Sequence, residues 1–141
     1  MKTLRMFMNA LSGTIQLNYL PGMMEAVFLN DNQLNGSLDL DRLPAAVRSL
    51  FLNSNEFTGK VSLEKLPNCL EYLELAVNQL NGTICLTSLP PALQSLYLER
   101  NNFEGSLDFT RFYDKRFSGT IDLWNLPESM VLLDVRTNGL S

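Results

Sequence analysis

The sequence predicts a solenoid of stacked 23-residue repeats, a right-handed superhelix that is mostly β-structure with little or no helix. Prolines, glycines and asparagines all return at that one spacing, and three residue types keeping one period is not chance. They are Pro21, Pro44, Pro67 and Pro90, then Gly13, Gly36, Gly59, Gly82 and Gly105, and finally Asn9, Asn32, Asn55, Asn78 and Asn101. One repeat cannot bury its own apolar side chains, so the copies are expected to stack.

Apolar residues mark the first half of each repeat. We number the repeat so that slot 1 holds Met1, Met24, Val47, Leu70 and Leu93. Leucine or another apolar residue then fills slots 4, 6 and 11, as in the stretch 70–80. This pattern predicts one strand per repeat, and stacked copies of it would form a parallel sheet on the concave side with strands about 4.8 Å apart.

The second half of each repeat is also regular. Slots 15 and 17 are apolar, whereas slots 14 and 16 are mostly polar, and this alternation predicts a shorter strand at slots 14–17 on the convex side. The glycine of slot 13 is expected to adopt a backbone φ that other residues resist. The asparagine amides of slot 9 are expected to form a buried hydrogen-bonded ladder through Asn9, Asn32, Asn55, Asn78, Asn101 and Asn138.

The repeat divides the chain into about six units within a single domain, 1–141. The units are 1–23, 24–46, 47–69, 70–92, an irregular unit 93–129, and a partial unit 130–141. The irregular unit puts Pro127 37 residues after Pro90, or 23 plus 14, which indicates a nine-residue deletion between about Gly105 and Phe117. We expect a squeezed turn, a bend or disorder around 106–118. No polar cap is visible at either end, so a fragment of a longer array is one expectation.

Composition excludes several classes of function. The net charge of −4 gives no sign of the basic patch that nucleic-acid binders usually carry, so no nucleic-acid partner is expected. The chain has no histidine, which removes histidine-based catalysis and metal sites, and its two cysteines are too few for a zinc site. Neither a signal peptide nor an apolar run of membrane-spanning length is visible, so we expect no membrane insertion and, for the chain as written, a cytoplasmic location.

The repeat pattern L-P-x-x-L-x-x-L-x-L-x-x-N-x-L-x-G-x-I-x-L closely resembles the 23-residue leucine-rich repeats abundant in kinetoplastid protozoa. The resemblance covers almost the whole chain except the stretch near 106–118. It implies a leucine-rich-repeat solenoid of the α/β repeat class. It also implies a protein-interaction module, sometimes belonging to a surface or secreted protein.

The concave strands of such a solenoid would turn slots 3, 5, 7 and 8 outward, and large side chains fill these slots in the middle repeats. Exposed aromatic residues concentrate at interface hot spots. We therefore predict a partner-binding patch of Phe28, Phe51, Tyr72, Glu74, Tyr97, Glu99 and Arg100. The alternative is that the aromatic side chains only pair across strands and stabilise the sheet. The pair Glu74 and Glu99 could in principle do acid–base chemistry, but an open sheet offers little burial to separate their pKa values.

The expected function is non-catalytic binding of another protein, of unknown identity, on the concave face. No enzyme activity, cofactor, metal ion or small-molecule substrate is expected. Two alternatives stay open from the sequence: a structural or cell-surface array element without a defined partner, and a truncated piece without independent function. A fold of this kind does not itself specify a partner.

Overall fold

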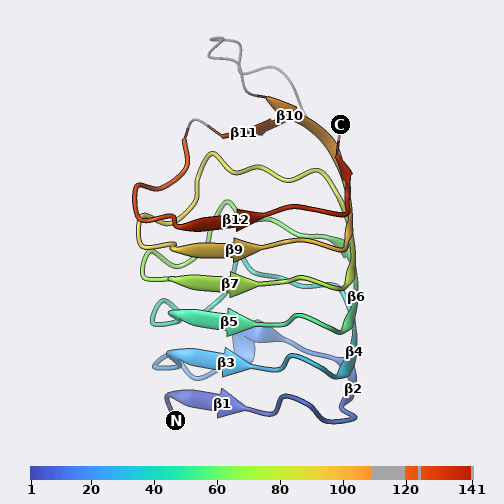
Figure 1. Cartoon of the computed structure of the whole chain (residues 1–141). Helices are drawn as coiled ribbons and strands as arrows, with labels where there is room; N and C mark the ends of the chain where they lie inside the picture. Colours follow the sequence, from blue (N-terminus) through green and yellow to red (C-terminus); the bar gives the residue numbers. More distant parts are fainter. Residues whose placement is uncertain (109–119, 124, 141) are drawn as a thin grey trace.

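The computed structural model describes residues 1–108, 120–123 and 125–140, and it shows a parallel β-solenoid (Figure 1). One strand from each turn joins a first sheet in the order β1-β3-β5-β7-β9-β12. These strands are β1 (Thr3–Arg5), β3 (Ala26–Phe28), β5 (Ser49–Phe51), β7 (Tyr72–Glu74), β9 (Ser95–Tyr97) and β12 (Leu132–Asp134). All of them occupy slots 3–5 of their repeats and pair in parallel, as predicted.

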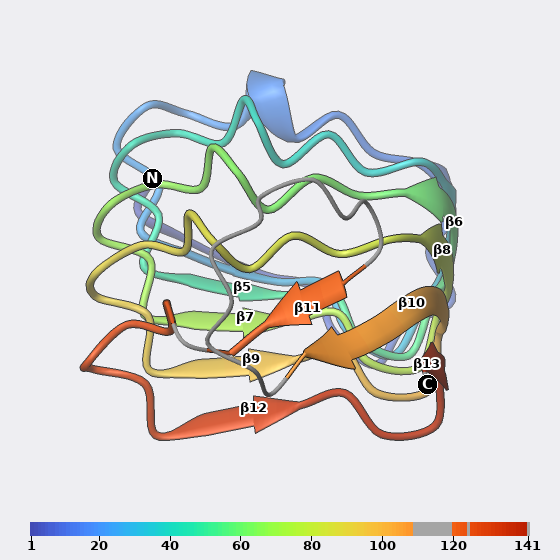
Figure 2. The ribbon, with the colours of Figure 1, turned by 90° about the horizontal axis from the view of Figure 1, so that it is seen from above.

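A second parallel sheet lies on a neighbouring side of each turn (Figure 2), in the order β11-β10-β8-β6-β4-β2 with β13 also paired to β10. Its strands are β2 (Ser12–Thr14), β4 (Gln33–Gly36), β6 (Glu56–Lys60), β8 (Gln79–Gly82), β10 (Asn102–Asp108), β11 (Thr120–Asp122) and β13 (Gly139–Leu140). Within the described residues, the only helical segment is the 3-10 turn η1 (Leu17–Tyr19). The predicted fold class, two parallel strands per repeat with almost no helix, is confirmed.

The second strand begins earlier in the repeat than the alternation of slots 15 and 17 suggested. In β4 and β8 it covers slots 10–13 and ends at the glycine. Gly82 has a φ of 80°, and a Cβ there would lie 2.8 Å from Cγ of Lys60, so this position favours glycine. The alternation instead reflects burial, since Leu38 and Leu40 point into the core from a segment without strand pairing.

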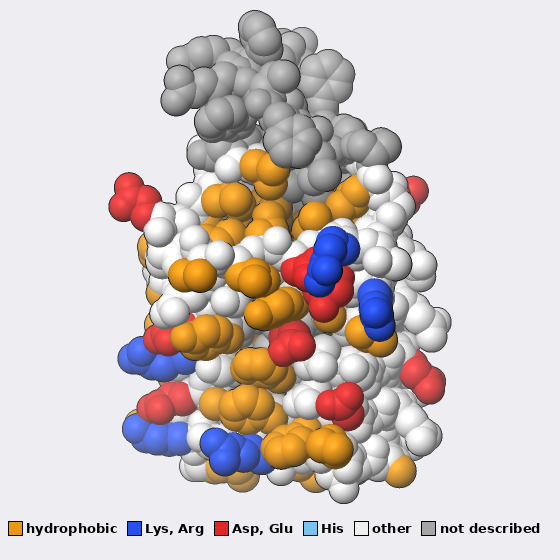
Figure 3. Space-filling view, in the orientation of Figure 1, with side chains coloured by type: hydrophobic (Ala, Val, Ile, Leu, Met, Phe, Trp, Pro, Cys, Tyr) orange, Lys and Arg blue, Asp and Glu red, His pale blue; other side chains and the backbone are white. Residues whose placement is uncertain are grey.

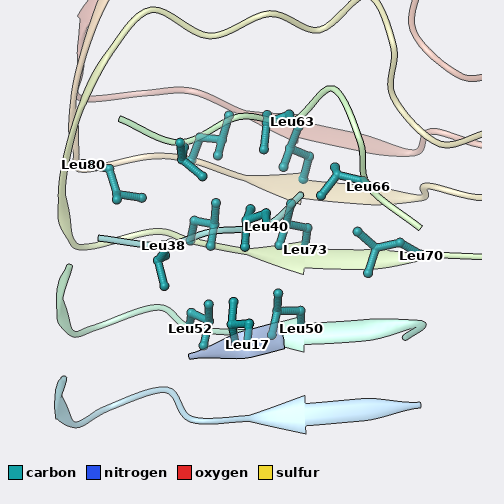
Figure 4. Packing of buried hydrophobic residues seen from close by; sticks show 14 of the residues in the cluster. Leu17, Leu38, Leu40, Leu50, Leu52, Leu63, Leu66, Leu70, Leu73 and Leu80 are labelled. Carbon is teal, nitrogen blue, oxygen red and sulfur yellow. The ribbon is translucent and has the colours of Figure 1, made fainter. Parts of the chain in front are cut away.

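The core is a column of stacked leucines enclosed by the two sheets (Figure 4). Slots 1, 4, 6, 11, 15 and 17 supply it in the second, third and fourth turns. In the second repeat these are Met24, Val27, Leu29, Leu34, Leu38 and Leu40, all buried. Each such side chain contributes roughly 1.5–3 kcal/mol through burial, and most of that is available only because a neighbouring turn covers it.

Buried asparagine amides join each turn to the one before it. Asn78 Nδ2 donates to the backbone oxygen of Leu52 in the preceding turn (3.1 Å) and to that of Leu75 in its own turn (3.1 Å). Its Oδ1 accepts a hydrogen bond from the backbone N–H of Phe57 (3.1 Å). Asn32, Asn55, Asn101 and Asn138 repeat this arrangement. Asn9 is exposed and donates only to the carbonyl of Phe7, because β1 is the first strand of the sheet.

The irregular unit 93–129 contributes a single strand to the first sheet, because β12, which follows it, pairs directly with β9. Leu132 of β12 pairs with Ser95 of β9, and the amide of Asn138 reaches Phe103 and Leu98 at sequence separations of 35 and 40. The corresponding separations for Asn101 are 21 and 26, so this turn carries 14 additional residues. Ser106 pairs with Thr120 where β11 lies on β10. The segment 109–119, which holds most of the expected defect, lies outside the described residues.

Every turn bends through one residue with a left-handed backbone at slot 8. These residues are Met8, Asp31, Ser54, Val77, Arg100 and Thr137, with φ between 54° and 56°. Sequence periodicity gave no sign of this bend, because no residue type recurs at the slot. The conformation costs a non-glycine residue roughly 1–2 kcal/mol, and the branched Cβ of Val77 and Thr137 makes it less favourable still.

Asn78→Ala is expected to lower the free energy of unfolding by about 2 kcal/mol, because the buried N–H of Phe57 loses its partner and the carbonyl of Leu52 keeps only the amide of Asn55. Asn9→Ala is the matched control and should cost less than about 0.5 kcal/mol, since Asn9 occupies the same slot but is exposed. Urea denaturation of both variants measures the difference. Equal costs would mean that the ladder does not join the turns.

Val77→Asn is expected to raise the free energy of unfolding by about 1 kcal/mol, because asparagine tolerates the left-handed backbone better than a β-branched residue. Val77 is 40% exposed, so little apolar burial is lost. Val131→Asn is the control, as Val131 is exposed and has no positive φ. A thermal melt that shows no gain for Val77→Asn over Val131→Asn would refute the strain at slot 8.

Candidate functional site: the outer face of the first sheet

The predicted partner-binding residues lie on or beside the outer face of the first sheet. Figure 3 shows hydrophobic side chains gathered over the middle of this face, with acidic side chains among them. We call this surface the aromatic–acidic face, defined by Phe28, Phe51, Tyr72, Glu74, Tyr97, Glu99 and Arg100. Phe28, Phe51, Tyr72, Glu74 and Tyr97 stand at slots 3 and 5 of the parallel strands, which places them in columns that run across the sheet. Glu99 and Arg100 follow the end of β9, at slots 7 and 8.

Slot 5 forms the central column. Strand register aligns Phe28 with Phe51, Phe51 with Glu74, and Glu74 with Tyr97. All four side chains are half-buried, so each keeps part of its surface open to a partner. Glu74 is therefore a carboxyl group with an aromatic residue on the strand to either side.

The lower part of the column is held together by its own contacts. The rings of Phe28 and Phe51 stack with centroids 5.0 Å apart, and the guanidinium of Arg5 lies 5.3 Å from the centroid of Phe28. Aromatic pairs of this kind contribute about 0.5–1.5 kcal/mol beyond their area burial. Phe28 and Phe51 thus stabilise the sheet, as the alternative interpretation expects, and still leave surface exposed.

Tyr72 stands beside the central column, at slot 3 of β7. Its side chain is 37% exposed, and its hydroxyl is 3.0 Å from Oε1 of Gln94, to which it donates. Tyr72 therefore presents a fixed ring with its polar end already satisfied, which suits contact with an apolar group.

Burial raises the pKa of the Glu74 carboxyl above its ordinary value, and the negative charges of Glu99 and Asp31 raise it further. No ion pair forms at Glu74 or Glu99 within the part of the chain that the structure describes. Glu74 ends β7, Glu99 lies two residues beyond the end of β9, and both residues are partly exposed. They form an acidic centre that makes no direct ion pair with any described residue.

Slot 7 holds two buried hydrogen-bond acceptors, one of which belongs to Glu99. Oδ1 of Asn53 and Oε2 of Glu99 are both buried and have no hydrogen-bond partner. Ala76 lies between them in the register, and it is only 2% exposed. The expectation that slot 7 faces outward in every repeat is therefore wrong at Ala76, because the short alanine side chain is covered by its longer neighbours.

A hollow of about 200 Å³ adjoins the acidic centre, lined by Val77, Glu99, Arg100, Arg136 and Thr137. The Arg136 guanidinium is bound to both carboxylate oxygens of Asp134 at distances of 2.6–3.0 Å. That contact holds the pKa of Asp134 below its usual value. The hydrogen bond to Asp134 raises the pKa of Arg136, and the charge of Glu99 raises it further. Arg100 stands exposed on the rim of the hollow.

Sequence reasoning did not single out Asp31, Asn53 or Ala76, although all three contribute to the environment of the acidic centre. The available signal was their position in slots 7 and 8, next to the slot-5 column. What the sequence could not give is which acceptors lack partners, since that depends on side-chain conformation.

The structure defines a repeat protein of the parallel β-solenoid class. No protein-family model matches the chain, and no curated protein is similar to it in sequence. In the described residues, no helix has both the length and the apolar character needed to cross a bilayer.

Glu74→Gln is expected to raise the free energy of unfolding near pH 7, because the variant no longer holds a carboxylate half-buried beside Glu99. A raised folded-state pKa means that the contribution of Glu74 is fully present below its unfolded value of 4.5 and is lost as pH rises through the folded value. The stability gain over wild type should therefore be absent at about pH 3.5 and present at about pH 7. Urea denaturation at both pH values measures it.

Glu56→Gln is the matched control, because it is the same substitution at an exposed residue of β6. It should show no comparable difference between the two pH values. A gain for Glu74→Gln that is larger at the lower pH would contradict the assigned environment of Glu74.

Proposed function

We propose that this chain is a leucine-rich-repeat protein, like the 23-residue repeats of kinetoplastid protozoa that it resembles, and that it binds another protein on the aromatic–acidic face. The repeat pattern supports the family. The face supports the binding, since it combines aromatic side chains with hydrogen-bonding groups in the way that interface hot spots do.

The observation that carries the proposal is the register of Phe28, Phe51 and Tyr97. These aromatic residues stand on the outer side of a sheet whose core side is already filled by leucine, so the core does not require them there. Stacking accounts for part of the Phe28 and Phe51 surface. It does not account for Tyr72 and Tyr97, which are aligned with other residue types and are partly exposed.

The proposed activity is recognition without catalysis. The chain has no histidine, and the carboxyl pair of Glu74 and Glu99 lies on an open sheet rather than in an enclosed cleft. General acid–base chemistry needs groups whose environments separate their pKa values and exclude water. An open face suits a macromolecule better than a small substrate, which is usually held in a concave pocket.

A phage-displayed library of short random peptides, panned against the full chain, tests the proposal. Selected peptides should lose at least about tenfold in affinity with Tyr97→Ser or Phe51→Ser, a change of about 1.4 kcal/mol. Tyr19→Ser is the control, because Tyr19 is 78% exposed away from both sheets and should leave binding unchanged. Circular dichroism and a thermal melt establish that each variant is folded.

Peptides that bind the chain equally well with and without Tyr97 and Phe51 would place recognition elsewhere. Failure to select any peptide would oppose the proposed function itself.

A further inference from the structure

We propose that the protein segment bound on the aromatic–acidic face presents a lysine or arginine side chain to Glu74 and Glu99. This inference rests on the proposed function, because it specifies the chemistry of the partner at that same face. The occupant is a cationic side chain flanked by apolar contacts, and three features of the face support it.

The first feature is the charge balance of the sheet. Other acids on or beside the first sheet have a cation of their own: Lys2 is 2.8 Å from Glu25, Arg48 is 2.9 Å from Glu71, and Arg136 is 2.6 Å from Asp134. Glu74 and Glu99 have none within the described residues, and Asp31 adds a third negative charge to their environment. Arg136 is within electrostatic range of Glu99, but its guanidinium is hydrogen-bonded to Asp134. The centre of the face is complementary to a positive charge.

The second feature is the hydrogen-bonding chemistry. The carboxylates of Glu74 and Glu99 are hydrogen-bond acceptors on a face that is partly open to solvent. A lysine ammonium brings three donors and an arginine guanidinium brings five, with no acceptor on either. A partner acid would be repelled here, and an apolar group would leave the acceptors unpaired at a cost.

The third feature is the pair of rings on either side of Glu74. Phe51 and Tyr97 occupy the adjacent strands in register, so the aliphatic stem of a lysine or arginine could lie against them while its charge reaches the carboxylate. The protein already makes such a contact with its own residues, because Arg5 lies over Phe28 at 5.3 Å in the same column. Cations within about 6 Å of a ring centroid are attracted to the ring face.

The experiment uses peptides selected on the full chain and compares each with a copy in which arginine becomes citrulline or lysine becomes acetyl-lysine. These replacements remove the charge and keep most of the shape. Selected peptides should be enriched in lysine or arginine, and neutralising that residue should weaken binding to wild type at least about tenfold. The same replacement should cost less than about twofold in the double variant Glu74→Gln, Glu99→Gln. Glu56→Gln, on the second sheet, should behave as wild type.

Two results would overturn the inference, and they are distinguishable. Peptides that require Tyr97 but contain no cation, or whose neutralisation costs as much in the double variant as in wild type, would leave the proposed function standing and remove the cationic partner. Absence of any peptide that depends on Tyr97 or Phe51 would remove both. Isothermal titration calorimetry on the four protein–peptide combinations supplies the affinities.

Discussion

The buried asparagine amide is the interaction on which the rest of this solenoid depends. A parallel stack leaves backbone groups of each turn unpaired at the bend between the two sheets, and unpaired buried groups are costly. Asn78 satisfies an N–H and a carbonyl of the preceding turn together with carbonyls of its own. The amide thus fixes both the spacing and the register of neighbouring turns, and the leucine column can be continuous only because they are fixed.

The outer face of the first sheet varies more than the core face, because it is constrained only by local contacts such as the stacking of Phe28 on Phe51. Slot 4 is Leu4, Val27, Leu50, Leu73, Leu96 and Leu133, whereas slot 5 is Arg5, Phe28, Phe51, Glu74, Tyr97 and Asp134. Residues that alternate along one strand therefore divide between the core and the outer face for which recognition is proposed. The carboxyl group of Glu74 is half-buried between aromatic neighbours, and this burial raises its pKa. The sheet could have accommodated an apolar side chain at the same position.

The sequence alone predicted the period, the first sheet, the buried slots and the position of the asparagines, because these follow from hydrophobic spacing. It misplaced the second strand, because burial of Leu38 and Leu40 produces the same alternation as strand pairing. It gave no sign of the left-handed bend at slot 8, where Val77 stands, because the residues at this slot differ in type from turn to turn. The spacing of Pro90 and Pro127 is also ambiguous, and only the pairing of β12 with β9 describes it as one turn with 14 additional residues.

The upper part of the aromatic–acidic face, which includes Tyr97 and Glu99, depends on the pairing of β12 with β9 after that long turn. Amide hydrogen exchange tests this directly, because Leu98 N–H donates to the carbonyl of Asp134 just as Leu75 N–H donates to that of Tyr97. The structure predicts that the Leu98 and Leu75 amides exchange with similar, strong protection. Rapid exchange at Leu98 beside a protected Leu75 would mean that β12 does not dock on β9, and it would contradict a continuous sheet.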